Sequence, residues 1–489
     1  MKRLYRIFSI SLFIVLFSAC VKNPVTGKGQ FGVMSEEREI AMGKAYDPQI
    51  VAQFGLYVDE DLQAYINAKG KEMAAISHRP QLEYEFKIMD SPVVNAFAVP
   101  GGFVYFTRGI MAHFNNEAEF AGVLGHEIGH ITARHSVVQQ RNATFAQLGL
   151  IAGMIAAPEL AQFAEPASAG VQLLLLKFGR DAESQSDELG VEYSTKIGYD
   201  SHEMAQFFNT LARKSEDSGA GEIPTFLSTH PNPLNRKENV HELTEEWQAN
   251  VAESDFEVGR NSYLQMIDGL VYGEDPRQGF VENWVFYHPD LEFEFPVPNG
   301  WQYQNSPQQF QMAPADGKSL MFLALAQGTD LQQAAGQLIE QYQLQVISNE
   351  NGTVNGFTAI EVIGQQVTQQ ATADTPAGTP TVKAKIMLIK YDGRIYQIVG
   401  ASAPGDFNSY QSQFNTTMGG FKRLTDQSKL NRLPERIDIV SVSSTMTLEQ
   451  ALRSKGIPDS RLEEFAVLNG MELSDQMAAG RLFKVISQN

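Results

Sequence analysis

The segment LGHEIGHITARH, residues 124–135, carries three histidines and a glutamate within a run whose apolar residues recur at helical spacing. On a helix those apolar residues form one stripe, and His126 and His130 point away from it, toward a cleft. Four residues apart, their Cβ atoms lie about 5–6 Å from each other, so both imidazoles can reach the same ion. Because polar groups without partners are costly to bury, the segment predicts a helix that binds a metal.

The pattern His-Glu-x-x-His is typical of hydrolytic zinc sites, in which two neutral imidazoles ligate the ion and the glutamate, here Glu127, is the general base. A catalytic zinc needs a third protein ligand and keeps one position for water. His135 lies on the far face of a continuous helix, so we expect it to be a surface or supporting histidine. The same pattern also occurs by chance, so the interpretation depends on a third ligand.

The candidate third ligand is Glu183, in the segment FGRDAESQSDELG. Asp187 follows it by one helical turn, so both carboxylates share a face. Glu183 would ligate zinc, and Asp187 would accept the N–H of a ligating imidazole and fix its tautomer. The alternative is a solvated helix face, on which acidic pairs at this spacing are common.

The N-terminal segment MKRLYRIFSISLFIVLFSAC has a basic start, an apolar run and small residues before Cys20, which is typical of a secretory signal rather than a spanning helix. Cys20 is the only cysteine, so a disulfide within the chain is excluded. The run LFSAC resembles the lipobox of bacterial lipoproteins, which implies removal of residues 1–19 and acylation of Cys20. The alternative is an ordinary signal that ends near a chance cysteine.

The mature chain is strongly acidic. The formal net charge is −19, and removal of the signal's Lys2, Arg3 and Arg6 leaves −22. Such acidity argues against nucleic acid as a partner. Val21 stands where lipoproteins retained at the inner membrane carry aspartate, so the lipobox resemblance implies the periplasmic face of the outer membrane. A soluble periplasmic protein is the alternative.

Composition divides the mature chain into three blocks, with a linker over 256–283 after the first block. The first block, 20–255, is rich in helical patterns and holds eight of the nine histidines. In it, VVNAFAVPGGFVYFTRGIM predicts two strands joined by a tight turn, and Asn116, three residues before Glu119, predicts the start of the metal-binding helix. The apolar runs LGLIAGMIAA and VQLLLLKF are too short to span a bilayer and predict a packed helical hairpin, with contact to a membrane surface as the alternative.

The second block, 284–424, has the alternation of β-strands in LEFEFPVP, SLMFLALAQ, FTAIEVIG, KAKIMLIKY and RIYQIVGASA, and DLQQAAGQLIEQYQL adds a helix. The third block, 425–489, pairs RIDIVSVS with RLFKVIS around two short helical patterns, giving a βααβ unit. We therefore expect an α+β protein: a helical zincin-type domain with a small sheet, an α+β accessory domain, and a small βααβ module.

The segments NPVTGK, VNAFAVPGG, GHEIGHITARH, RDAESQSDELG and STHPNP, in this order over about residues 23–245, resemble the gluzincin metalloendopeptidases of the BepA-like and Ste24-type (CAAX prenyl-protease) group. The resemblance implies one zinc ion per chain, held by His126, His130 and Glu183, with Glu127 as general base. None of these positions is substituted. The second block weakly resembles the PsbP/Mog-like fold and the third a LysM-like module, which implies contact with peptidoglycan; a protein-contact role is the alternative.

His230, in LSTHPNPLNR, matches a histidine that in BepA-like relatives approaches the zinc from a loop and holds the enzyme latent. The alternatives are a protonated donor to an oxyanion and a loop-capping histidine. Arg236 could orient either arrangement. The strand VVNAFAV could pair with an extended substrate peptide, with Asn95 and Ala96 as substrate-binding residues. A plain polar residue at a strand end is the alternative for Asn95.

Two functions stay open at this stage. The first is a zinc endopeptidase that hydrolyses misfolded or misassembled envelope proteins, with Glu127 as the base. The second is a chaperone or scaffold for outer-membrane protein assembly whose protease activity is latent or secondary. Helical repeats after the protease block would favour the second function, and the sequence contains none.

Overall fold

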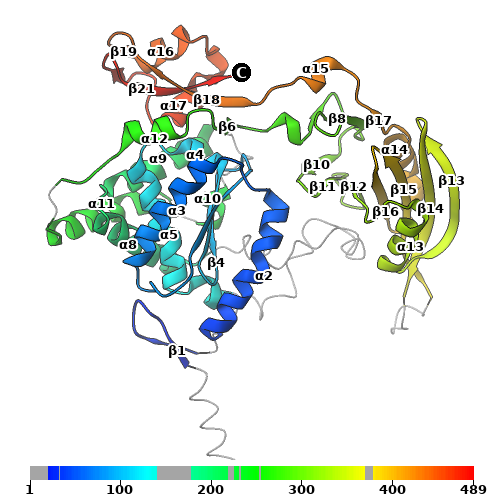
Figure 1. Cartoon of the computed structure of the whole chain (residues 1–489), viewed down its shortest axis with the longest axis horizontal. Coiled ribbons are helices and arrows are strands. Elements are labelled where there is room, and N and C mark those ends of the chain that lie inside the picture. The colour runs from blue at the N-terminus through cyan, green and yellow to red at the C-terminus, as the bar shows by residue number, and fades with distance from the viewer. Residues whose placement is uncertain are drawn as a thin grey trace, which may run out of the picture. The chain divides into compact units, whose positions relative to one another are not determined.

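The computed structural model describes residues 20–31, 34–139, 178–217, 225–230, 233–252, 255–368 and 378–488. The predicted signal and the predicted helical hairpin, LGLIAGMIAA with VQLLLLKF, lie outside these residues, except for Phe178 at the end of the second run. The described residues form two compact units, which Figure 1 shows with their elements labelled. Unit 1 contains the residues up to Gly273 and those from Glu435 onward, and unit 2 contains those between. Within the described parts, no helix combines the length and the apolar character that crossing a bilayer requires.

Most of unit 1 is helical. Its helices before unit 2 are α2 (Glu36–Phe54), α3 (Glu60–Ala75), α4 (Arg108–His113), α5 (Glu117–Thr132), α8 (Arg180–Lys196), α9 (His202–Asp217), α10 (Thr225–Thr229), α11 (Pro233–Asn250) and α12 (Arg260–Met266). The short strands β1 (Cys20–Lys22) and β2 (Gly29–Phe31) pair at the N-terminal end of the described chain.

A three-stranded sheet lies beside α5. Its central strand β5 (Phe103–Thr107) is parallel to β3 (Glu85–Met89) and antiparallel to β4 (Ala96–Val99), which leaves β3 and β4 as the two edges. The predicted tight turn between β4 and β5 is confirmed: Gly101 and Gly102 have φ of 90° and 107°. Only glycine adopts these angles without strain, so the turn depends on both residues.

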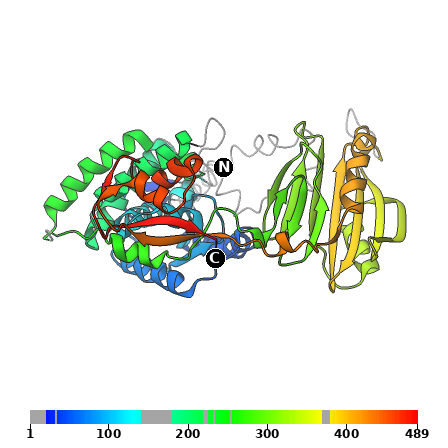
Figure 2. The ribbon, with the colours of Figure 1, turned by 90° about the horizontal axis from the view of Figure 1, so that it is seen from above.

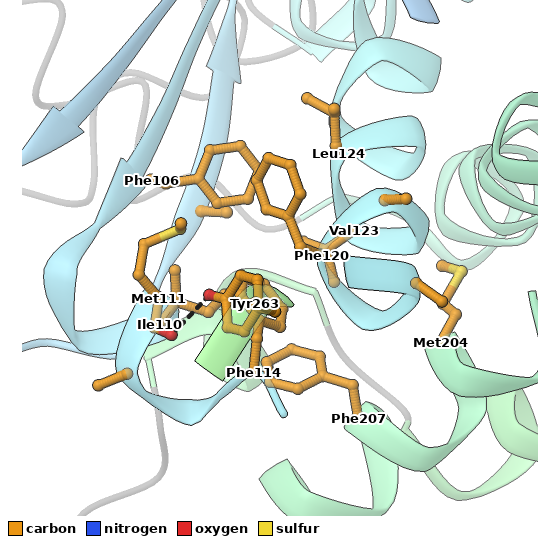
Figure 3. Close-up of a cluster of buried hydrophobic side chains, with 14 of the residues drawn as sticks. Phe106, Ile110, Met111, Phe114, Phe120, Val123, Leu124, Met204, Phe207 and Tyr263 are labelled. Carbon is orange, nitrogen blue, oxygen red and sulfur yellow. Dashed lines mark hydrogen bonds between the residues drawn. The ribbon is translucent and has the colours of Figure 1, made fainter. Parts of the chain in front are cut away.

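Helix α5 begins at the predicted residue. The side-chain oxygen of Asn116 accepts a hydrogen bond of 2.7 Å from the backbone N–H of Glu119, as an N-cap does. Every residue of α5 is buried, as expected for a helix that is apolar on most sides. Figure 3 shows its Phe120, Val123 and Leu124 within a cluster of aromatic and aliphatic side chains. Helix α5 is therefore the central element of unit 1.

The C-terminal segment, which we define as the described residues from Glu435 onward, also belongs to unit 1. Its elements are β18 (Glu435–Ser441), β19 (Met446–Thr447), α16 (Leu448–Ser454), the 3-10 helix η5 (Asp459–Arg461), α17 (Leu462–Leu468), β20 (Gln476–Met477) and β21 (Leu482–Ser487). The predicted βααβ order is present, and β18 pairs with β21. Strand β18 also pairs with β6 (Val271–Tyr272), and Figure 2 shows these C-terminal strands against the body of unit 1.

The structure differs from the predicted boundaries at both sides of unit 2. The sequence suggested a linker over 256–283 and a separate module over 425–489. Instead, α12 and the C-terminal segment contribute to the same apolar core as α5, through side chains such as Tyr263, Phe465 and Phe483. Contacts between residues so distant in the chain leave no local sequence pattern, which explains the difference.

Unit 2 is built on a seven-stranded antiparallel sheet in the order β10-β11-β12-β16-β15-β14-β13. The strands are β10 (Gln302–Asn305), β11 (Gln309–Ala313), β12 (Ser319–Leu325), β13 (Gln345–Val354), β14 (Phe357–Val367), β15 (Pro380–Tyr391) and β16 (Arg394–Ser402). A second sheet has the order β17-β9-β8-β7, with β7 (Phe280–Glu282), β8 (Val285–His288), β9 (Phe293–Pro296) and β17 (Lys422–Arg423). The helices are η4 (Pro276–Gln278), α13 (Leu331–Gln341), α14 (Phe407–Gly419) and α15 (Gln427–Leu430). The predicted α+β class is confirmed.

Candidate metal centre

Close packing of α5 on α8 brings the candidate ligands together. A Cβ atom at Gly125 would lie 2.9 Å from the carbonyl oxygen of Gly190, and one at Gly129 would lie 3.1 Å from Cβ of Leu189. Real Cβ atoms rarely come this near to other atoms, so larger residues at these positions would separate the helices. The glycines of GHEIGH therefore allow the carboxylates of α8 to reach the imidazoles of α5.

Four buried side chains converge on one point in unit 1: His126, His130, Glu183 and His230, each offering one ligand atom within 4.8 Å of the others. Nε2 of His126 lies 3.0 Å from Nε2 of His130 and 3.2 Å from Nδ1 of His230. Oε1 of Glu183 lies 3.0 Å from His230 Nδ1 and 3.5 Å from His130 Nε2. Two ligands of a tetrahedral zinc ion lie about 3.3 Å apart, so these separations fit a zinc site.

Asp187 is within hydrogen-bond distance of His126. Its Oδ1 lies 2.9 Å from His126 Nδ1, closer than the Nη2 of Arg236 at 3.3 Å. Arg236 donates two hydrogen bonds to Asp187, of 2.7 Å from Nε and 2.5 Å from Nη2. Burial by itself raises the pKa of Asp187, but Arg236 and His126 outweigh it and hold this pKa below its usual value. Arg236 thus holds in place the carboxylate that contacts His126.

His135 contacts the second imidazole, which is the supporting role that was one of the two expected for it. Its Nδ1 lies 3.1 Å from Nδ1 of His130, and its Nε2 lies 3.0 Å from Oε1 of Gln185. The expectation that His135 points to the far face was wrong, because α5 ends at Thr132 and Arg134 has a φ of 62°. The left-handed residue turns His135 back toward the helix end.

The tautomers of both imidazoles of α5 follow from their hydrogen-bond partners. A carboxylate accepts from Nδ1 of His126, so its Nε2 carries a lone pair. Burial lowers the pKa of His135 to about 4, so this ring is neutral and has one donor and one acceptor nitrogen. Its Nε2 donates to Gln185, and its Nδ1 accepts from Nδ1 of His130. Two lone pairs therefore face each other at 3.0 Å beside a carboxylate. Without a cation between them they repel, so the donor set fits a metal ion.

The cluster is fully enclosed rather than open to the expected cleft. His126 and His130 are 0 % and 1 % exposed. Phe178 stacks on His130 with ring centroids 4.0 Å apart, and Phe226 stacks on His230 at 4.5 Å. The short helix α10, which ends just before His230, carries Phe226 over the site. The sequence could not show this cover, because it comes from residues far from α5.

Glu127 lies at the edge of the cluster. Its side chain is completely buried, and neither carboxylate oxygen has a hydrogen-bond partner among the described residues. Oε1 lies 3.8 Å from Nε2 of His230. Burial raises the pKa of Glu127, and the nearby histidines oppose this shift only in part. A carboxylate left without hydrogen-bond partners beside a candidate metal-binding cluster is available to accept a proton.

Asn95 and Ala96 stand at the start of edge strand β4. Asn95 is buried, and its Oδ1 has no hydrogen-bond partner within the described chain. Its backbone N–H donates to the hydroxyl of Thr107 at 3.1 Å. The neighbouring carbonyl of Val94 accepts from the backbone N–H of Phe226, at 3.1 Å. Helix α10 thus contacts the chain where β4 begins. Cys20 lies in β1 and is not part of this site.

The profile of peptidase family M48 matches residues 60–244, a range that contains the whole buried cluster. The chain therefore carries an M48 peptidase domain. The predicted resemblance to BepA-like metalloendopeptidases is confirmed by this match and by the relatives that align with this region.

The M48 domain is similar to two kinds of named protease. The beta-barrel assembly-enhancing protease of Yersinia pestis is 30% identical over 221 residues, which cover 44% of this chain and 45% of that protein. The mitochondrial metalloendopeptidase OMA1 of Arabidopsis thaliana is 31% identical over 179 residues, which cover 36% of this chain and 35% of that protein. This chain thus spans less than half the length of these two relatives.

The solved structures that resemble part of the chain include a PsbP protein. Cyanobacterial PsbP (CyanoP) from Synechocystis sp. PCC 6803 covers 28% of this chain and 91% of its own, with a TM-score of 0.23 and 11% identity. At this score the similarity supports no inference. The PsbP/Mog-like fold of 284–424 and the LysM-like character of 425–489 stay predictions.

Proposed function

We propose that the chain is a zinc-dependent endopeptidase, in which His126, His130 and Glu183 hold one zinc ion and Glu127 is the general base. The observation that carries the proposal is the convergence of two imidazole lone pairs and a carboxylate on one buried point. Three such ligands leave one coordination position for water, as catalytic zinc sites do. The M48 match supports the same reaction class.

The protein groups around this point have separate tasks. When bound, zinc supplies Lewis acidity that polarises a scissile carbonyl and acidifies the attacking water. Glu127 takes the proton of that water and delivers it to the leaving amine. Asp187 and His135 keep the two imidazoles in the ligating tautomer, and Arg236 holds Asp187 in place. Burial raises the pKa of Glu127, which brings this base closer to the working pH.

We infer that His230 makes the described arrangement a latent one. With Nδ1 3.2 Å from His126 Nε2 and 3.0 Å from Glu183, His230 would be a fourth protein ligand. A tetrahedral zinc with four protein ligands has no position for water. His230 must therefore leave the cluster before hydrolysis. This feature favours the second candidate function, a chaperone or scaffold whose protease activity is latent.

We propose unfolded or misassembled envelope proteins as substrates, since close relatives of the M48 domain carry the name beta-barrel assembly-enhancing protease. An extended segment of such a protein would pair with edge strand β4, with Asn95 and Ala96 beside it. Acylation of Cys20 would hold the protein at the periplasmic face of the outer membrane, and a soluble periplasmic form is the alternative. Peptidoglycan contact through the C-terminal segment stays a prediction.

Metal analysis and a protease assay on the purified full chain test this function. We expect one zinc per chain in the wild type and in Glu127→Gln, and at least a hundredfold loss of cleavage of an unfolded protein in Glu127→Gln alone. Glu188→Gln, on the exposed face of α8, is the matched control and should behave as wild type. His130→Ala combined with Glu183→Ala should lose the metal. Full zinc in that double variant, or near-normal cleavage by Glu127→Gln, would refute the assignment.

A further inference from the structure

Lys484 of β21 is a completely buried lysine that uses all its hydrogen-bond donors. Its Nζ donates to the backbone carbonyls of Ala112 at 2.8 Å, Phe114 at 2.6 Å and Leu468 at 3.0 Å. Three acceptors match the three hydrogens of an ammonium group, whereas a neutral amine would place a lone pair against one carbonyl oxygen. Burial lowers the pKa of Lys484 well below its usual value, whereas Glu119 and the three carbonyl acceptors favour the charged side chain.

The three carbonyls belong to the ends of two helices. Ala112 and Phe114 lie at the C-terminal end of α4, and Leu468 is the last residue of α17. A cation at a helix C-terminus satisfies free carbonyls and interacts favourably with the helix dipole. One side chain thus joins a helix of the M48 domain to a helix of the C-terminal segment.

Lys484 contacts the short turn between α4 and α5, residues 114–116. Phe114 is followed by Asn115 and by Asn116, the N-cap of α5. Arg260 donates to the carbonyl of Asn115 at 3.2 Å and to that of Leu482, on β21, at 3.3 Å. A Cβ atom at Gly470 would lie 2.8 Å from the side-chain amide of Asn115. The C-terminal segment therefore surrounds this turn closely.

Two further contacts make the turn rigid. Asn469, which is buried, pins the backbone of Lys484: its Oδ1 accepts from the N–H of Lys484 at 2.8 Å, and its amide donates to the Lys484 carbonyl at 3.0 Å. The ring of Phe114 packs against Phe120 and Phe207, as Figure 3 shows. A displacement of the turn would consequently move the first turns of α5.

We propose that Lys484 is a positioning residue for the metal centre, and that the C-terminal segment is a working part of the peptidase rather than a separate targeting module. The inference rests on the proposed function of that centre. Because α5 is buried on all sides, it shifts as one rigid body, and Lys484 sets where it presents His126 and Glu127. A misplacement of about 1 Å in a reacting geometry can lower a rate a hundredfold.

The test compares two buried lysines in the full chain. Lys484→Met removes the three donors and keeps an unbranched side chain that is only one atom shorter. Lys385→Met is the matched control, since Lys385 is a buried lysine of unit 2 that donates to Asn415 and pairs with Glu361. At a temperature where circular dichroism shows both variants folded, we expect Lys484→Met to lower kcat at least tenfold with KM within twofold. It should also change the visible spectrum of the cobalt-substituted protein, and the control should change neither.

A folded Lys484→Met with normal kcat and a normal cobalt spectrum would overturn the proposal. If Lys484→Met does not fold, Asn469→Ala takes its place, because it releases the backbone of Lys484 and should lower kcat in the same way. A folded Asn469→Ala with unchanged kcat and spectrum would overturn the proposal equally. A wild-type chain that binds neither zinc nor cobalt and cleaves nothing would refute the proposed function and this inference with it.

Discussion

The side-chain amide of Asn23 donates a 3.0 Å hydrogen bond to the carbonyl of Ala133, at the C-terminal end of α5. The Oδ1 of Asn23 accepts from the N–H groups of Val25 and Thr26, at 2.9 and 3.0 Å, and so shapes the turn between β1 and β2. Arg79 adds a 3.0 Å hydrogen bond to the carbonyl of Ile131. The end of α5 opposite the Lys484 turn is thus held by residues that precede the M48 sheet.

Asn23→Ala should destabilise unit 1 by about 1–3 kcal/mol, because it removes the partner of the buried Ala133 carbonyl and of two part-buried N–H groups. Urea unfolding at pH 7 measures this loss. Asn250→Ala is the control, since its amide donates to the carbonyl of Glu246 on an exposed face, and it should cost less than about 0.5 kcal/mol. A loss in Asn23→Ala no larger than that of the control would contradict the role of Asn23.

His230→Ala should raise basal cleavage of an unfolded protein, and self-cleavage, several-fold at unchanged zinc content. Removal of the fourth imidazole opens the coordination position that water needs. Zinc content and initial rates measure the two effects, with His241→Ala, a histidine of α11 outside the cluster, as control. A fall in turnover with zinc retained would instead assign His230 to oxyanion stabilisation.

Glu464→Gln should destabilise the chain at neutral pH and less so in acid. Burial alone raises the pKa of Glu464, but hydrogen bonds from Arg461 and the hydroxyl of Tyr272 outweigh it and hold this pKa below its usual value. Such a carboxylate stabilises the folded state above the unfolded pKa, and the stabilisation is lost as pH falls through the folded pKa. The urea midpoints of variant and wild type should therefore converge below about pH 4. A gap that widens in acid would reverse the sign, and Glu245→Gln, on an exposed part of α11, should show no gap at either pH.

Much of the candidate metal centre was readable from the sequence because it is local. The N-cap at Asn116, the spacing of His126 and His130, and the one-turn separation of Glu183 and Asp187 each lie within a single helix. Such patterns follow helix geometry and need no knowledge of the fold.

Features that depend on distant residues were not predicted. Lys484 meets Phe114 across 370 positions of the chain, and no spacing signals that contact. His135 reaches His130 only because Arg134 turns left-handed at the helix end. Strand β13 was missed because most of its residues are exposed on both faces, so it lacks the alternation by which strands are recognised.

Cys20→Ser should release the protein from membranes into the soluble periplasmic fraction, since it removes the only residue that the lipobox resemblance marks for acylation. Fractionation and labelling with radioactive palmitate compare the variant with the wild type. Persistence of the variant in the membrane pellet at high salt would reveal another anchor. An unlabelled wild type would refute acylation itself.

The pairing of β6 with β18 has a consequence for the time at which the peptidase is completed during synthesis. The chain leaves unit 1 after β6 and returns only at Glu435, so all of Glu274–Pro434 is synthesised before β18, β21 and Lys484 exist. At typical rates of 5–20 residues per second this takes on the order of ten seconds. Throughout that interval the nascent chain already contains all four candidate metal ligands but lacks strand β21, whose Lys484 contacts the turn before α5. A chain released early, while unit 2 is being synthesised, would therefore contain the GHEIGH segment of α5 but not Lys484.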